Sequence, residues 1–149
     1  MNVIALDLTK RPPRSPRVRL GGFVILPRLL DKGRATIVGT NGEYHYNCPM
    51  DQRFFEFLGV DAEALKEQLN AGKGDWEIFQ WIQAKAKNKP TAAEIDSWSK
   101  TQEHRSPEDA ESRDYFDGLL AKAAPGRKDI TTWFELLDVD DFASFGGRP

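Results

Sequence analysis

Most of the side chains that could transfer a proton or attack an electrophile lie in one short segment, EYHYNCPMD (residues 43–51). It contains His45 and Cys48, whose side-chain types titrate nearest to neutral pH in proteins. In an extended segment, residues three apart point to opposite faces, so these two would form a nucleophile–base pair only across a turn. Tyr46 and Asp51 are further candidates for proton transfer. The simpler interpretation makes Cys48 a small buried apolar residue and His45 a surface residue.

A second group of candidates consists of arginines, and Arg34 in LLDKGRATIVG (residues 29–39) is the most informative of them. On a helix it lies at the edge of an apolar stripe, and an arginine buried there without a partner is costly. One interpretation is an ion pair with Asp31 or with acidic residues later in the chain. The other is a cleft for a carboxylate or phosphate, which guanidinium groups bind in bidentate fashion. The residues of this predicted anion site are Arg17, Arg19, Arg28, Asp31 and Arg34.

The sequence contains no pattern that is typical of a metal or nucleotide site. One cysteine and two histidines do not fill a zinc site. The run LDVDD (residues 137–141) lacks the spacing, the glycine and the terminal glutamate of a calcium loop, so we expect a solvated acidic turn. Neither GxGxxG nor GxxxxGK[ST] is present, which excludes nucleotide binding by those loops. We therefore expect no metal and no cofactor.

The charges are divided unevenly along the chain. Residues 1–34 hold eight Lys or Arg and two Asp, a net of +6, and residues 35–149 hold 13 basic and 21 acidic residues, a net of −8. Three prolines and five basic residues in TKRPPRSPRVRL (residues 9–20) predict an extended arm over residues 1–20. This arm could lie across the acidic remainder of the chain. Nucleic-acid binding is not expected, because that acidic remainder would repel a duplex and the arm has no aromatic residues to stack on bases.

The first long apolar stretch predicts a helix that spans residues 22–38, with Gly39 as its cap. Its predicted core stripe consists of Phe23, Leu26, Leu30, Gly33 and Ile37. A competing pattern follows, because Asn41 and Gly42 between alternating runs are typical of a hairpin that would place Ile37 opposite Tyr46. We favour the helix, and expect at most a short extended segment or hairpin near residues 36–47.

Capping residues predict the remaining helices. The expected caps are Asp61 before AEALKEQLNA, Asp75 before WEIFQWIQAKAK, Thr91 in TAAE and Ser106 in SPED. A last short helix, ITTWFELL, leads into an acidic tail that ends in glycines. The expected fold is mainly α: a compact single-domain bundle of five to six helices over residues 1–149.

Two segments, SPRVRLGGFVILPRLLDKGRA (residues 15–35) and GEYHYNCPMDQRFFEFLGVD (residues 42–61), resemble a bacterial family. The family is catalogued as domain of unknown function five thousand and sixty-nine, and the resemblance extends over nearly the whole chain. It implies a small, soluble, stand-alone protein and favours a helix over residues 29–39. The family brings no established reaction and no catalytic residues, so the candidates above depend on this sequence alone.

The single cysteine excludes an internal disulfide and points to a reducing compartment. The start of the chain lacks a basic region before its short apolar run, and the longest apolar run, FVILP, is far shorter than the roughly 20 residues that span a bilayer. We therefore expect a cytoplasmic protein that does not enter the membrane. The sequence does not predict its oligomeric state.

These observations predict a binding or interaction module whose partner is an acidic protein segment or an anionic small molecule. The alternative is a small enzyme whose anionic substrate is oriented by Arg17, Arg28 and Arg34, with His45 or Tyr46 in proton transfer. A cleft that encloses His45 together with the arginines would favour the enzyme, whereas arginines spread over a surface would favour the module.

Overall fold

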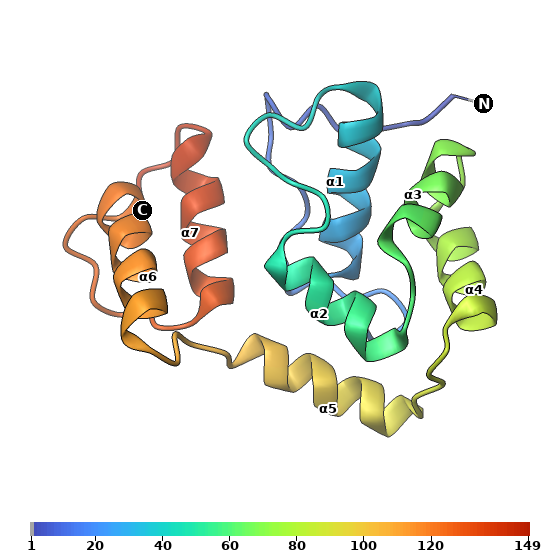
Figure 1. Ribbon diagram of the computed structural model, residues 1–149. Helices are drawn as coiled ribbons and strands as arrows, with labels where there is room; N and C mark the ends of the chain where they lie inside the picture. The colour runs from blue at the N-terminus through green and yellow to red at the C-terminus, as the bar shows by residue number, and fades with distance from the viewer. Residues whose placement is uncertain (1) are drawn as a thin grey trace.

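The computed structural model describes residues 2–149, and these residues form seven α-helices and no β-strand (Figure 1). The helices are α1 (Leu26–Val38), α2 (Pro49–Leu58), α3 (Ala62–Asn70), α4 (Asp75–Lys85), α5 (Ala92–Glu103), α6 (Ala110–Ala123) and α7 (Trp133–Ser144). The predicted helical class is confirmed, with seven helices in place of five or six. The helix that the sequence did not predict is α2. Its N-cap is Cys48, and cysteine is not one of the residue types that usually cap helices.

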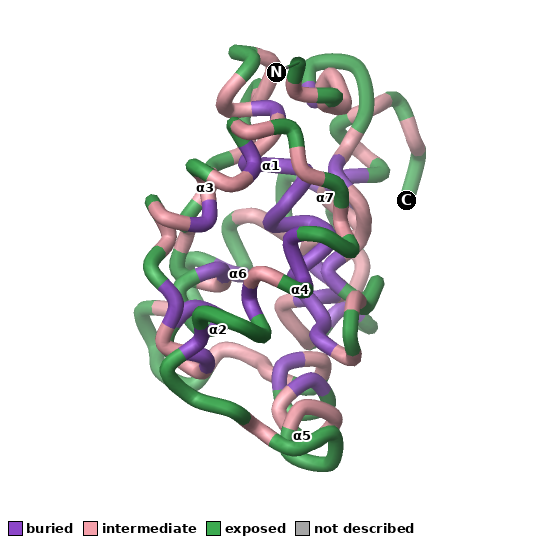
Figure 2. Tube along the Cα trace, turned by 90° about the vertical axis from the view of Figure 1, so that its right-hand side faces the viewer, coloured by how far each residue is buried: buried purple, intermediate pink, exposed green. Residues whose placement is uncertain are grey.

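Helix α1 occupies the interior of the fold, and buried residues follow it in Figure 2. It begins at Leu26, later than predicted, and ends at Gly39, whose φ of 78° lets its N–H reach the carbonyls of the last turn. The prediction of a helix that ends near Val38 is confirmed. The competing hairpin is wrong, because residues 40–48 form turns and no strand. Three charged residues of α1 are buried, namely Arg28, Asp31 and Lys32. The helix therefore places charged side chains in the interior of the protein.

The main core forms where α1 packs against α2 and α3, and α3 packs against α4. Gly33, an unusual residue for the middle of a helix, permits this close packing. A Cβ atom at this position would lie 2.6 Å from Leu69 Cδ1 and 3.1 Å from the ring of Tyr46. The close approach of α3 thus explains why a glycine stands in the middle of α1.

Helix α5 crosses one side of the molecule and links α4 to α6 (Figure 1). Its Thr91 cap accepts a hydrogen bond from the Glu94 N–H, as predicted. Trp98 stacks on Phe57 of α2 with ring centroids 5.2 Å apart. Buried Ser99 accepts the Val24 N–H, so α5 is anchored to the chain that leads into α1.

Helices α6 and α7 form a hairpin, residues 110–144, set beside the other helices in Figure 1. It has a small apolar cluster of its own around Phe116, Ile130 and Leu136. One residue of α7, Phe134, also belongs to the main core. Hence the α6–α7 hairpin is attached to the rest of the fold by one apolar contact region and by the polar contacts described below.

Several predicted helix starts and faces need correction. Asp61 caps α3 as expected, but Asp75 is the first residue of α4 and Gly74 is its cap. Asp109 rather than Ser106 caps α6, because residues 105–108 have no regular secondary structure and the helix begins only at Ala110. The acidic run at residues 137–141 lies inside α7 and is neither a turn nor a tail.

Two aromatic residues that lie on the apolar arcs of their helices are not part of the core. Trp76 of α4 is 60% exposed and Tyr115 of α6 is 64% exposed. A helical pattern marks the apolar arc of a helix, but how much of that arc is covered depends on its neighbours.

Among the described residues, no helix is both long and apolar enough to cross a membrane.

Candidate functional site

The structure does not bring the residues of the predicted anion site together. Arg34 pairs with Asp75 of α4, with Nη1 2.8 Å from Oδ1. Asp31, the nearer partner considered from the sequence, instead binds Arg14 of the arm through Nη2 at 2.9 Å. Arg14 also binds Asp75 at 2.8 Å, so two arginines share that carboxylate. Burial alone would raise the pKa of Asp75, but hydrogen bonds from Arg14 and Arg34 outweigh it and the pKa is lowered.

Two further arm arginines, Arg17 and Arg19, are also paired with carboxylates. Arg17 lies 2.9 Å from Asp138 of α7, which also accepts a hydrogen bond from Ser15. Arg19 binds Asp96 and Glu103 of α5, each at 2.9 Å. The arm therefore crosses between α5 and α7, and the charges of Arg14, Arg17 and Arg19 are already neutralised within the chain.

Arg28 forms the most buried of these pairs. Its Nη1 lies 2.8 Å from Asp141 Oδ2 and its Nη2 lies 3.2 Å from Oδ1, a bidentate contact between α1 and α7. The Tyr44 hydroxyl donates to the same carboxylate at 2.8 Å. Burial, followed by this bond to Asp141, raises the pKa of Tyr44 well above its ordinary value. Burial, with the charge of Asp141, also raises the pKa of neighbouring Asp140.

The candidates for proton transfer fall into different environments. Tyr46 is held in place, since its hydroxyl donates to the Ala62 carbonyl at 2.6 Å. Burial is the main cause of a pKa far above that of free tyrosine. His45, by contrast, is exposed. The two residues are therefore poor partners for one another in moving a proton.

Cys48 contacts a lysine rather than His45. The buried ammonium of Lys32 donates to Cys48 Sγ at 3.3 Å and forms an ion pair with Asp51 at 2.8 Å. Asp51 in turn accepts the backbone N–H of Asn47 at 3.0 Å and so fixes the start of α2. This arrangement places the only cysteine of the chain beside a positive charge at the first turn of a helix.

Beside Cys48 the structure contains a cavity of about 930 Å³. One wall comes from residues 42–53, which include the start of α2, and the other comes from the α6–α7 hairpin. His45, Cys48, Lys32 and Arg28 line it, whereas the remaining predicted arginines do not. The volume is in the range of small-molecule sites, roughly 300–1,000 Å³. This cavity is therefore the candidate site.

Two further arginines, Arg53 of α2 and Arg105 after α5, line the cavity. Among residues 2–149, Arg53 has no carboxylate within 4.0 Å, and the only one near Arg105 is that of Glu108 at 4.0 Å. The Arg105 side chain is 18% exposed and that of Glu108 is 76% exposed. Burial, and then the charge of Arg53, lower the pKa of Arg105. Two cations thus lie near one another with little compensation from the protein.

A comparison with protein families finds one whose model matches residues 10–143, described as Domain of unknown function (DUF5069). The chain belongs to the DUF5069 family. A comparison with curated proteins finds no match. The matched residues include α1 to α6 and all but the last residue of α7, so most of the cavity lining lies within the DUF5069 domain, and Leu8, Thr9, Ser144 and Phe145 lie outside it.

Sequence reasoning missed three basic residues of this candidate site, Lys32, Arg53 and Arg105, and only one of them left a local signal. Lys32 follows Arg28 by four residues on α1, which places both on one helix face. Arg53 and Arg105 lie on elements far apart in the chain, and neither stands in a pattern that marks a site. Their proximity depends on how α5 returns past α2.

Proposed function

We propose that this protein binds a small organic anion in the cavity, with Arg53 and Arg105 holding the anionic group. The observation that carries the proposal is the weak compensation of these two guanidinium groups, described above. Arg53 is exposed, but the Arg105 side chain is only 18% exposed, and a partly buried positive charge needs a carboxylate or an anionic ligand near it. A ligand carboxylate between the two side chains would provide what the chain does not.

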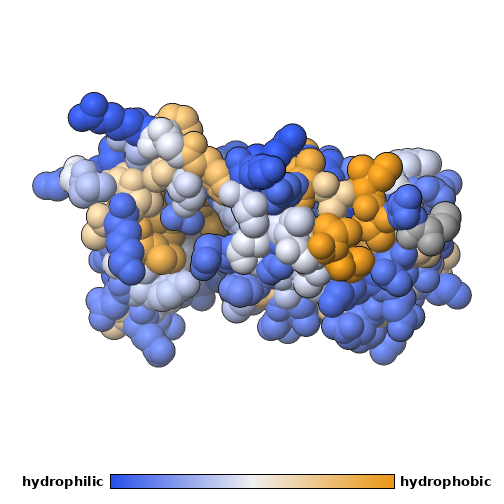
Figure 3. Space-filling model, turned by 90° about the horizontal axis from the view of Figure 1, so that it is seen from above, coloured by the Kyte–Doolittle hydropathy of each residue, from blue (hydrophilic) through white to orange (hydrophobic). Residues whose placement is uncertain are grey.

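The arm is not the binding element in this proposal. Arg17, Arg19 and Arg34 each have a carboxylate within 3 Å, so a ligand would have to displace partners already in place. The anionic small molecule expected from the sequence is retained, but its site moves from the arm to the cavity. An acidic protein segment is less well supported as the partner. The face shown in Figure 3 carries apolar patches separated by hydrophilic side chains, rather than one continuous hydrophilic surface.

An enzyme that relies on Arg17, Arg34 and Tyr46 is not favoured. The two arginines are outside the cavity lining, and the tyrosine hydroxyl is bound to a backbone carbonyl. His45 and Cys48 do line the cavity, but Lys32, and not His45, contacts the sulfur. Binding is the function that these contacts support best. A free thiol in this position also fits the reducing cytoplasm expected from the sequence.

Cys48 gives a direct test, because it is the only cysteine and it lines the same cavity. Its sulfur can displace iodide from iodoacetate, which is an anion, or from iodoacetamide, which is neutral. Either reaction forms one S–C bond and releases iodide. If Arg53 and Arg105 attract anions, the ratio of the iodoacetate rate to the iodoacetamide rate should fall about threefold or more in R53Q and in R105Q.

The ratio cancels differences in the intrinsic reactivity of the thiol, and mass spectrometry counts one adduct per chain. R113Q is the matched control, since Arg113 lies on α6 outside the cavity lining and pairs with Asp117. The same ratio in wild type, R53Q and R105Q would show that the two arginines do not attract anions, and the proposal would fail.

A further inference from the structure

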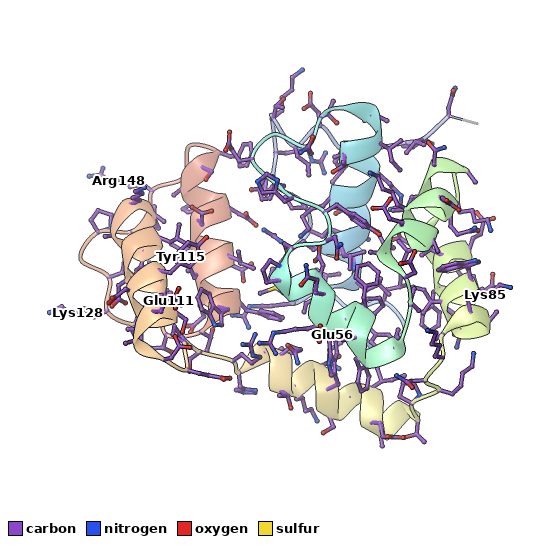
Figure 4. The ribbon with its side chains drawn as sticks, in the orientation of Figure 1. Glu56, Lys85, Glu111, Tyr115, Lys128 and Arg148 are labelled. Atoms are coloured by element: carbon purple, nitrogen blue, oxygen red, sulfur yellow. The ribbon has the colours of Figure 1, made fainter. Side chains whose placement is uncertain are left out.

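An aromatic pair lies next to the arginines of the proposed site. The backbone N–H of Trp133 donates to the backbone carbonyl of Arg105 at 3.0 Å, so the two side chains start from adjoining backbone. Tyr115 lies beside Trp133, with ring centroids 6.4 Å apart, and Figure 4 shows it on α6. Both rings line the cavity.

The two rings are not covered by the cores of the protein. Trp133 is half-buried and packs its edge against Phe116, with centroids 5.1 Å apart. Tyr115 is 64% exposed, so most of its ring is in contact with water. Apolar side chains continue the same wall of the cavity, including Leu119 and Leu136. An apolar ring placed against this wall would remove both aromatic side chains from water.

The charge around the arginines restricts how many negative charges a ligand can carry. Glu108 and Asp109 line the cavity beside Arg105, and Glu43 and Asp140 line it elsewhere. Three of these, Glu43, Glu108 and Asp109, are exposed. A ligand with a single charge can reach the arginine pair, whereas a phosphate chain or a nucleic acid would meet these carboxylates and be repelled.

We infer that the ligand is an aromatic monocarboxylate, with its carboxylate between Arg53 and Arg105 and its ring against Trp133 and Tyr115. This inference rests on the proposed anion site and adds the class of molecule that the site selects. Bidentate guanidinium contacts suit a planar carboxylate, and the aromatic wall suits a planar body.

Four probes separate the two parts of the inference: benzoate, acetate, benzamide and AMP. The indole N–H signals of the four tryptophans report binding in ¹H–¹⁵N spectra, and W133F identifies the signal of Trp133. Benzoate should shift the Trp133 signal and bind about tenfold or more tightly than acetate, because acetate has no ring to bury. It should also bind about tenfold or more tightly than benzamide, which lacks the charge. R53Q and R105Q should each weaken benzoate binding by about tenfold, and R113Q should leave it unchanged.

The contrary results are distinguishable. Acetate that binds as tightly as benzoate, or AMP that binds more tightly, overturns the aromatic monocarboxylate but leaves an anion site. Benzamide that binds as tightly as benzoate overturns the anion site. No shift of the Trp133 signal with any probe overturns both. Melting curves of the three arginine variants, if they match wild type, exclude unfolding as the reason for lost binding.

Discussion

The arginines of this protein lie in two different surroundings, one beneath the arm and one at the cavity. Where the arm crosses α1 and α4, Arg14 and Arg34 both bind Asp75, and Arg14 also binds Asp31. Each of these contacts is shorter than 3 Å, and three chain segments meet in them. This cluster is complete without a ligand, so its role is to hold the arm against the helices.

At the cavity the positive charges of the arginines have fewer carboxylates near them. Arg53 has no carboxylate within 4.0 Å among residues 2–149, and Arg105 has only the exposed Glu108 at 4.0 Å. Arg53 lies close enough to Arg105 for its charge to lower the pKa of Arg105, after the larger effect of burial. The difference shows that the number of partners, not the residue type, separates a structural arginine from a candidate for binding.

The largest effect is expected at Arg28, which lines the cavity but has the partners of a structural arginine. In R28M the carboxylate of Asp141 would stay buried with only Tyr44 as a polar partner. Breaking a buried pair in this way costs about 3 kcal/mol of unfolding free energy, or roughly 6–12 °C in melting temperature for a domain of this size. Urea unfolding and calorimetry of R28M and wild type would measure it. A loss below about 1 kcal/mol would place Arg28 with the binding arginines instead.

Asp75 should show the next largest effect, because one carboxylate serves two arginines. D75N is expected to lower the unfolding free energy by about 1–2 kcal/mol at pH 7, a value reduced for the partial exposure of the site. The folded-state pKa of Asp75 is below its ordinary value, so its contribution is present above about pH 4 and is lost as the pH falls further.

Urea unfolding from pH 7 to pH 3 would test this dependence. Wild type should lose more stability below pH 4 than D75N does, since the variant has no carboxylate to protonate at this position. D114N, on the exposed surface of α6, serves as the control and should follow wild type. Parallel curves for wild type and D75N would mean that the arm cluster adds no net stability.

Arg34 should show a smaller effect than Asp75, because Asp75 keeps Arg14 when Arg34 is removed. R34M is expected to melt about 2–4 °C below wild type, which corresponds to about 1 kcal/mol. Adding R34M to D75N should lower stability by less than the sum of the two changes, since both remove the same contact. Full additivity would show that Arg34 contributes through something other than Asp75.

Local chemistry explains which parts of the fold the sequence predicts. Gly39, Asp61 and Thr91 end or begin helices through bonds to residues within a few positions, and each was predicted correctly. The start of α2 was missed because Cys48 is a poor cap on its own. The carboxylate of Asp51 and the Lys32 ammonium, which comes from another helix, complete it.

The candidate site depends on contacts that no local pattern contains. His45 and Cys48 were named from the sequence and do line the cavity, because one segment carries both. Arg34 was named for its place at the edge of a predicted apolar stripe, but its partner Asp75 lies 41 residues further along the chain. Arg53 and Arg105 are brought together only by the path of α5, and the absence of a short ion pair leaves no trace in a sequence.

The smallest effect on stability, and the sharpest contrast with the arm cluster, is expected for R53Q and R105Q. Neither change removes a short ion pair, and each removes repulsion between two like charges, so the unfolding free energy should stay within about 0.5 kcal/mol of wild type or rise slightly. Urea unfolding in low salt would measure the change, and R34Q, a matched substitution in the arm cluster, should be visibly less stable. A loss of about 1 kcal/mol or more in R105Q would mean that its distant contact with Glu108 stabilises the fold, and the two surroundings would then differ in degree only. If stability is unchanged while the preference of Cys48 for iodoacetate is lost, the two arginines are dispensable for folding and serve to bind an anion.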